Sequence, residues 1–155
     1  MKMEFGSIDE ILEFAIDGEK QAVQFYTSLA RQATRTSLKE VFENFAKEEK
    51  KHVTLLSDMA GNKEKIDSYE FKEVTDLKIS DYMVEIEYKE GMPMPEILKI
   101  AMKREEKATK LYTMLSEQTD DAAGKKVFSI LAQEEKKHKL TLETMYDDYM
   151  ADQEN

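Results

Sequence analysis

Two histidines and the glutamates that precede them are the residues in this sequence best suited to hold a metal ion. Glu49 lies three residues before His52, Glu135 lies three residues before His138, and the 155-residue chain has no other histidine. Residues three apart on a helix share one face, so the carboxylate and imidazole of each pair can reach the same ion. Oxygen-rich ligand sets with one imidazole per metal suit iron or manganese, and zinc is a possible occupant. The spacing therefore predicts metal binding.

A further glutamate lies inside an apolar helical stripe in the segment before each pair. Glu19 and Glu105 stand where the helical period requires a core residue, and no lysine or arginine shares their stripes. A buried carboxylate without a counter-charge is costly, and several together would also repel one another. Bound cations would remove both penalties. We therefore expect two metal ions, most simply iron, held by six residues: Glu19, Glu49, His52, Glu105, Glu135 and His138.

Two other glutamates compete for the same role. Glu48 and Glu134 lie one turn from the histidines, at i and i+4, and could in principle face them. The three-residue spacing favours Glu49 and Glu135, and we expect Glu48 and Glu134 to be solvated. A single Glu-x-x-His motif arises often by chance. Its occurrence at both histidines argues against the alternative of ordinary helix-surface residues.

The sequence repeats itself after 86 residues. The segment EKQA at 19–22 aligns with EEKA at 105–108, and EEKKH at 48–52 recurs at 134–138. The repeat halves cover about residues 7–61 and 93–150, joined by a connection over about 62–92. Such self-similarity indicates one supersecondary unit used twice. We expect a single domain over residues 1–155, which is long enough to bury its own core.

A tyrosine follows each lone glutamate by seven residues, two helical turns along the same face. These residues are Tyr26 and Tyr112. One interpretation is plain core packing. The other is a phenol that donates a hydrogen bond to a ligand carboxylate or to a bound oxygen species, as groups around metal ligands often do. The sequence leaves both open.

Each repeat half is expected to form two long antiparallel helices, because short turns separate its apolar stripes. Pro93 and Pro95 are the only prolines, so helices can run uninterrupted almost everywhere. Residues typical of helix ends stand where these helices are expected to begin and end. They are a capping box of Ser37 with Glu40, Gly61 as a C′ residue, Pro95 at the first helical position, and Asp120 or Asp121 as the last N-cap.

The middle segment over residues 66–91 is too long for a turn and carries enough apolar residues to pack. We expect a crossover connection with a short helix near residues 80–87. Two helix hairpins joined in this way predict an all-α protein, specifically a four-helix bundle with a long crossover.

Composition excludes several classes of protein. The formal net charge of −10 argues against nucleic acid as a partner. No apolar run reaches membrane-spanning length and the first residues contain no secretory h-region, so a cytoplasmic protein is expected. The absence of cysteine excludes disulfides, iron–sulfur clusters and a Cys₄ iron centre within this polypeptide.

With these motifs the chain resembles the rubrerythrins, in particular their ferritin-like di-iron domain. The resemblance rests on DGEKQAVQFY, FAKEEKKH, KREEKATKLY and LAQEEKKH, which cover both helix pairs. It implies a di-iron centre that reduces hydrogen peroxide, an external electron donor such as a rubredoxin, and a homodimer. It further implies roles for the six residues: Glu19 and Glu105 as terminal ligands, Glu49 and Glu135 as bridging ligands, and His52 and His138 as one imidazole per iron.

The sequence departs from the rubrerythrin pattern in two places. The third helix of the family carries a further glutamate, three residues after the terminal ligand, which exchanges with histidine as the irons change oxidation state. Here that residue is Ala108, the counterpart of Ala22, so we expect a symmetric site without the exchange. The chain also has no rubredoxin domain. Three functions are therefore compared: peroxide reduction in oxidative-stress defence, a ferroxidase that oxidises Fe(II) with dioxygen, and a scaffold that keeps the site for stability.

Overall fold

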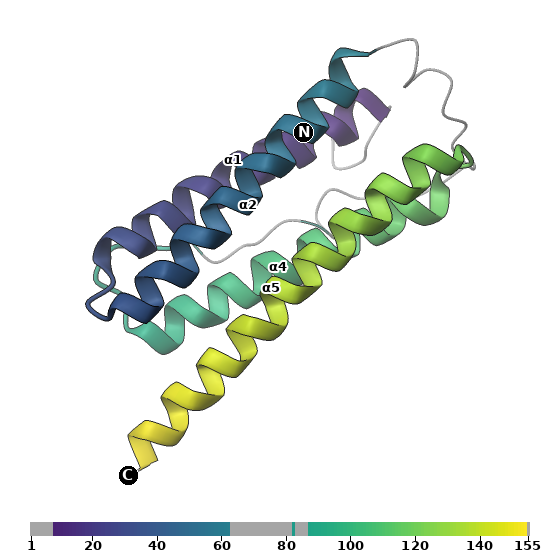
Figure 1. The fold of residues 1–155 in the computed structure, drawn as a ribbon. Helices are drawn as coiled ribbons and strands as arrows, with labels where there is room; N and C mark the ends of the chain where they lie inside the picture. Colours follow the sequence, from purple (N-terminus) through teal and green to yellow (C-terminus); the bar gives the residue numbers. More distant parts are fainter. Residues whose placement is uncertain (1–7, 63–81, 83–86, 155) are drawn as a thin grey trace. The chain divides into compact units, whose positions relative to one another are not determined.

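The computed structural model describes residues 8–62, 82 and 87–154. Within these ranges the chain forms four long helices, as the sequence predicts (Figure 1). They are α1 (Ile8–Gln32), α2 (Thr36–Gly61), α4 (Met94–Gln118) and α5 (Ala122–Glu154). The chain divides into two compact units, one built on α1 and α2 and the other on α4 and α5.

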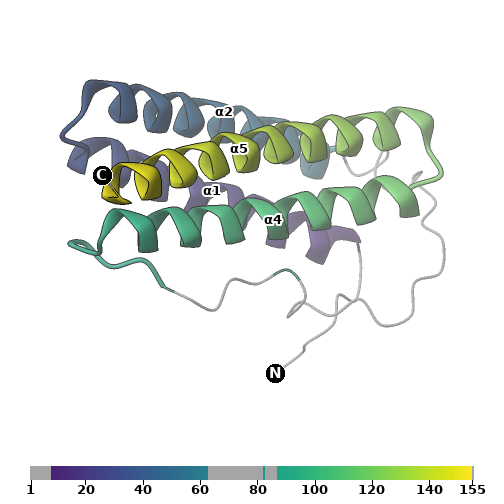
Figure 2. The ribbon, with the colours of Figure 1, turned by 90° about the horizontal axis from the view of Figure 1, so that it is seen from below.

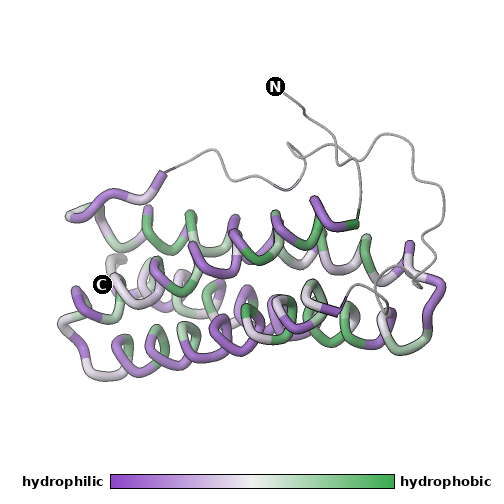
Figure 3. Tube along the Cα trace, turned by 90° about the horizontal axis from the view of Figure 1, so that it is seen from above, coloured by the Kyte–Doolittle hydropathy of each residue, from purple (hydrophilic) through white to green (hydrophobic). Residues whose placement is uncertain are grey.

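The first unit is an antiparallel hairpin of α1 and α2, whose helices pack along their length (Figure 2). The turn between them is short. The Ala33 amide donates to the Leu29 carbonyl at 3.0 Å at the end of α1, and the Lys39 amide donates to the Arg35 carbonyl at 3.1 Å at the start of α2. Apolar and polar residues alternate around each helix (Figure 3), which gives each one a face to bury.

The second unit is the hairpin of α4 and α5, which repeats this design. The Thr119 amide donates to the Leu115 carbonyl at 3.1 Å, and the Thr119 hydroxyl donates to the same carbonyl at 2.6 Å. Asp121 then caps α5, because its Oδ2 accepts a hydrogen bond from the Gly124 amide at 2.8 Å. Of the two candidate caps, Asp121 is thus the one that makes the bond.

Three predicted helix ends are wrong in detail. Helix α2 begins at Thr36, with Arg35 as N-cap and no side-chain cap, so Ser37 lies inside the helix and does not form the expected capping box. Gly61 is the last residue of α2, and Asn62 follows as C-cap. Pro95 occupies the second position of α4, after Met94. Each difference is one or two residues, because neighbouring polar and small residues compete for a helix end.

The turn before α4 contains Gly91, whose φ of +87° lies in the left-handed region that favours glycine. Upstream of it, Tyr82 is buried, and the Lys110 ammonium of α4 lies 5.7 Å from its ring centroid. The short helix predicted near residues 80–87 falls on residues of which the structure describes only Tyr82 and Glu87, so it lies outside the described part.

Candidate metal centre

The α1–α2 hairpin brings together one lone glutamate and one Glu-x-x-His pair. Glu19 comes from α1, while Glu49 and His52 come from α2, and each side chain is 2–3% exposed. The Nδ1 atom of His52 lies 3.5 Å from Oε2 of Glu19 and 3.4 Å from Oε1 of Glu49. The imidazole therefore faces two carboxylates that are closed off from solvent.

The α4–α5 hairpin builds the same group a second time. Glu105 comes from α4, Glu135 and His138 come from α5, and their exposed fractions are 2%, 0% and 3%. The Nδ1 atom of His138 lies 3.4 Å from Oε1 of Glu105 and 3.8 Å from Oε2 of Glu135. The same histidine nitrogen thus faces the carboxylates in both hairpins. We call the two groups the α1–α2 half-site and the α4–α5 half-site.

The donor set of each half-site fits a divalent cation. Within a half-site, ligand atoms of the two glutamates and the histidine all lie within 4.8 Å of one another. The nitrogen–oxygen distances of 3.4–3.8 Å exceed the usual N–H···O range. They match two donors that share one ion at bond lengths of about 2.1 Å, which lie roughly 3.0–3.8 Å apart for bond angles of about 90–130°. Carboxylate oxygens with one imidazole suit iron or manganese.

The competing glutamates take no part in these groups. Glu48 is exposed, as expected for a solvated residue, and Glu134 is half-buried. Neither belongs to a potential metal-ligand group found among the described residues. The three-residue spacing thus selected the buried glutamate of each EEKKH segment.

The two tyrosines are core residues, each 1% exposed. Tyr26 packs against three aromatic rings: its ring centroid lies 5.2 Å from those of Phe25 and Phe45 in edge-on contacts, and 6.2 Å from that of Phe42 in a stacked one. These contacts give Tyr26 the packing role that the sequence allowed. These contacts involve the aromatic ring of Tyr26 and not its phenol oxygen.

Sequence reasoning missed Thr109, which touches a proposed ligand residue directly. Its hydroxyl donates a 2.8 Å hydrogen bond to the backbone carbonyl of Glu105, one turn earlier in α4. The repeat contained the clue, because the counterpart of Thr109 in α1 is Val23, which has no hydroxyl. The two half-sites therefore have the same candidate ligand residues and different neighbours.

Comparison with known proteins identifies the family. The sequence profile of the rubrerythrin family matches residues 10–146, which is most of the chain. The chain belongs to the rubrerythrin family. A hypothetical protein from Pyrococcus furiosus is 31% identical, with a TM-score of 0.72 over 92% of this chain and 89% of that chain.

A candidate ferritin-like diiron-carboxylate protein from Thermotoga maritima is 23% identical, with a TM-score of 0.75 over 96% of this chain and 99% of that chain. A comparison with curated proteins gave no match.

Membership of the family confirms two predictions. The fold is the ferritin-like four-helix bundle, and the chain is a metal-binding protein of the di-iron type. No helix in the described part of the chain has the length and apolar character needed to cross a membrane.

Proposed function

We propose that this chain binds two iron ions through Glu19, Glu49, His52, Glu105, Glu135 and His138 and reduces hydrogen peroxide to water. The observation that carries the proposal is the duplicated half-site, in which each hairpin buries two carboxylates around one histidine Nδ1 atom. In this proposal Glu19 and Glu105 would serve as terminal ligands, Glu49 and Glu135 would be shared by the two metals, and each histidine would serve one metal.

Charge balance supports two divalent ions. Four carboxylates carry four negative charges, two ferrous ions carry four positive charges, and the imidazoles bind as neutral ligands. The loaded site would then be neutral, which makes its burial far less costly than that of the bare carboxylates. A single divalent ion would leave two buried negative charges uncompensated.

A bound ferrous pair would supply the two electrons that, with two protons, break the O–O bond of one peroxide molecule and give two water molecules. The protein residues have other tasks. The six ligands hold the ions, and the buried apolar side chains around them limit the entry of bulk water. We further propose that the phenol O–H groups of Tyr26 and Tyr112 donate hydrogen bonds toward ligand carboxylates or the bound oxidant.

The remaining partners follow from this chemistry. The ferric pair must be reduced again, and the chain contains no cysteine for a second redox centre of its own. We therefore propose an external one-electron donor of the rubredoxin kind. A homodimer in the cytoplasm and a role in oxidative-stress defence complete the proposal.

The test is stopped-flow oxidation of the anaerobically prepared di-ferrous protein by hydrogen peroxide and, separately, by dioxygen. Two electrons complete the reduction of peroxide, whereas dioxygen needs four to reach water. Faster oxidation by peroxide, with one peroxide consumed per chain, is the expected result.

A clear preference for dioxygen would favour the second candidate, a ferroxidase with the same six ligands. The residue that favours this candidate is Ala108, which replaces the exchangeable glutamate of the family. A protein that reacts with neither oxidant would be left with a structural metal site.

A further inference from the structure

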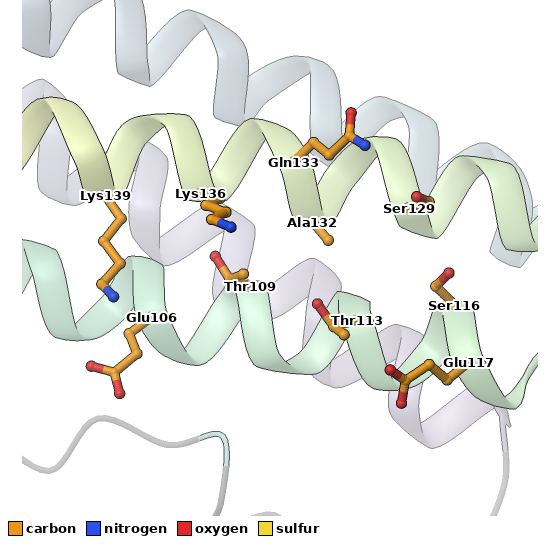
Figure 4. Close-up of a pocket in the computed structure, with 10 residues that line it drawn as sticks. All are labelled: Glu106, Thr109, Thr113, Ser116, Glu117, Ser129, Ala132, Gln133, Lys136 and Lys139. Carbon is orange, nitrogen blue, oxygen red and sulfur yellow. The ribbon is translucent and has the colours of Figure 1, made fainter.

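A groove with a volume of about 400 Å³ lies between α4 and α5 (Figure 4). Thr109, Thr113 and Ser116 line it from α4, and Ser129, Ala132 and Lys136 face them from α5. Figure 4 shows these residues as three rungs between the helices: Lys136 with Thr109, Ala132 with Thr113, and Ser129 with Ser116. Two of the three pairs join small side chains, which leave space between the helices unfilled.

The groove lies at the height of the proposed ligands. On α4 its lining includes Glu106 and Thr109, the next residue and the next turn after Glu105. On α5 it includes Lys136, which follows Glu135 directly. Thr109 lines the groove and also contacts the half-site segment, because its hydroxyl donates to the Glu105 backbone carbonyl at 2.8 Å. The groove therefore borders the backbone segments that carry Glu105 and Glu135.

The lining suits a small, neutral, hydrogen-bonding molecule. Four hydroxyls and the Gln133 amide supply donors and acceptors. Two lysines and two glutamates leave no net charge, and two of them are engaged at the rim: Lys139 pairs with Glu143 at 3.5 Å, and Glu106 pairs with Lys103 at 3.7 Å. Water and hydrogen peroxide have this chemistry, whereas a charged species would gain little here.

The matching face of the other hairpin is built differently. The counterpart of Ser129 is the larger Glu43, that of Thr109 is Val23, which has nearly the same shape without a hydroxyl, and that of Ser116 is Ala30. Ala30 is 5% exposed, and Ala46, the counterpart of Ala132, is 6% exposed. Ser116 and Ala132 are both half-buried. At Ser116 and Ala132 the seam between α4 and α5 is thus more exposed than the seam between α1 and α2 at the corresponding alanines.

We propose that water and hydrogen peroxide reach the metal centre along the α4–α5 groove, so that the α4–α5 half-site is the accessible half. This inference rests on the proposed function for the identity of the oxidant. The internal repeat makes the two halves equal in their ligands, and the groove makes them unequal in their access.

The test places one bulky side chain in each hairpin at a matched position. Thr113 and its counterpart Thr27 are both exposed, so Thr113→Phe and Thr27→Phe should fold. Thr113→Phe is expected to lower the second-order rate constant of the di-ferrous protein with peroxide by roughly threefold or more. Thr27→Phe should leave it at the wild-type value. Ala132→Leu, which fills the same rung from α5, should act like Thr113→Phe.

A second measurement does not depend on turnover. With Mn²⁺ in the site, the water-proton relaxation rate reports how readily water reaches the metal. Thr113→Phe should reduce this enhancement and Thr27→Phe should not. The proposal is overturned if Thr113→Phe matches the wild type in both measurements, or if the two variants fall equally. Wild-type protein that does not react with peroxide would defeat the proposed function, while the relaxation comparison would still decide whether the groove is the route.

Discussion

The Nδ1 atom of His138 in α5 lies 3.4 Å from Oε1 of Glu105 in α4. The equivalent atoms of the other hairpin, Nδ1 of His52 and Oε2 of Glu19, are 3.5 Å apart. In both cases the lone glutamate meets the histidine across the contact between two helices of one hairpin. Each hairpin therefore carries one imidazole beside two carboxylates, so replacing one histidine should weaken one metal position more than the other.

The histidines test this expectation. His52→Ala and His138→Ala each remove the only imidazole of one half-site, so each variant should retain about one metal ion per chain where the wild type holds about two. The measurement is elemental analysis after anaerobic loading with iron. Lys51→Ala and Lys137→Ala, which change exposed neighbours at repeat-equivalent positions, are the matched controls and should load fully. Loss of all metal in either histidine variant would mean that the half-sites bind only together.

Metal removal should lower thermal stability strongly. Without cations, four carboxylates that are at most 3% exposed remain in the protein interior. A ligand that binds only the folded state stabilises it by mass action, so we expect the melting temperature of the metal-free protein to lie roughly 10 °C below that of the loaded form. Calorimetry before and after chelation measures the difference, and equal melting temperatures would show that the cluster does not need a cation.

Neutralising one buried carboxylate should raise the melting temperature of the metal-free protein and lower that of the metal-loaded protein. Glu135, which is 0% exposed, gives the sharpest case. Glu135→Gln removes a charge, so the metal-free variant should melt above the metal-free wild type; it also removes a ligand, so the loaded variant should melt below the loaded wild type. Glu134→Gln changes the half-buried neighbour and should leave the melting temperatures of both forms near the wild-type values. A variant that melts lower in both forms would contradict the role of repulsion.

The sequence identified the buried glutamates and histidines of both half-sites because helix geometry converts spacing into direction. Glu19 and Glu105 interrupt apolar stripes, and the three-residue step to each histidine picks Glu49 over Glu48, as their burial bears out. Helix ends were less predictable. The start of α2 offers Arg35, Thr36 and Ser37 as possible N-caps. The free energies of using one or another of them differ by about 1 kcal/mol. The groove could not be foreseen, because it depends on which α4 residue faces which α5 residue across the seam.

Two glycines should respond oppositely to alanine. Gly18 lies inside α1, is exposed, and has nothing within 4 Å of where a Cβ would stand. Gly18→Ala should raise the free energy of unfolding by about 0.5–1 kcal/mol, since glycine in a helix costs roughly that much relative to alanine. Gly91 has a φ of +87°, so Gly91→Ala should lower the free energy of unfolding by about 1 kcal/mol despite equally open space. Chemical denaturation of both variants in the loaded form is the measurement, and a destabilised Gly18→Ala would refute the helix argument.

The last prediction concerns the missing glutamate of the family. Ala108 lies three residues after Glu105 on α4 and is half-buried, whereas its counterpart Ala22 on α1 is buried at 9% exposure. Ala108→Glu adds a carboxylate one turn from a proposed ligand, where it can act as a seventh, exchangeable one. If ligand exchange assists peroxide reduction, the rate constant of the di-ferrous protein with peroxide should rise and that with dioxygen should change less. The added negative charge should also lower the melting temperature of the metal-free form.

Ala22→Glu is the matched control for this variant. It adds the same carboxylate to the other half, at the more deeply buried position, and should cost more stability without the gain in rate. Stopped-flow oxidation with each oxidant, at equal iron content, compares the three proteins. An Ala108→Glu variant that binds two irons and reacts with peroxide no faster than wild type would show that this protein does not depend on the exchange. A rate gain in both variants would instead assign the effect to added negative charge, because only charge is common to the two positions.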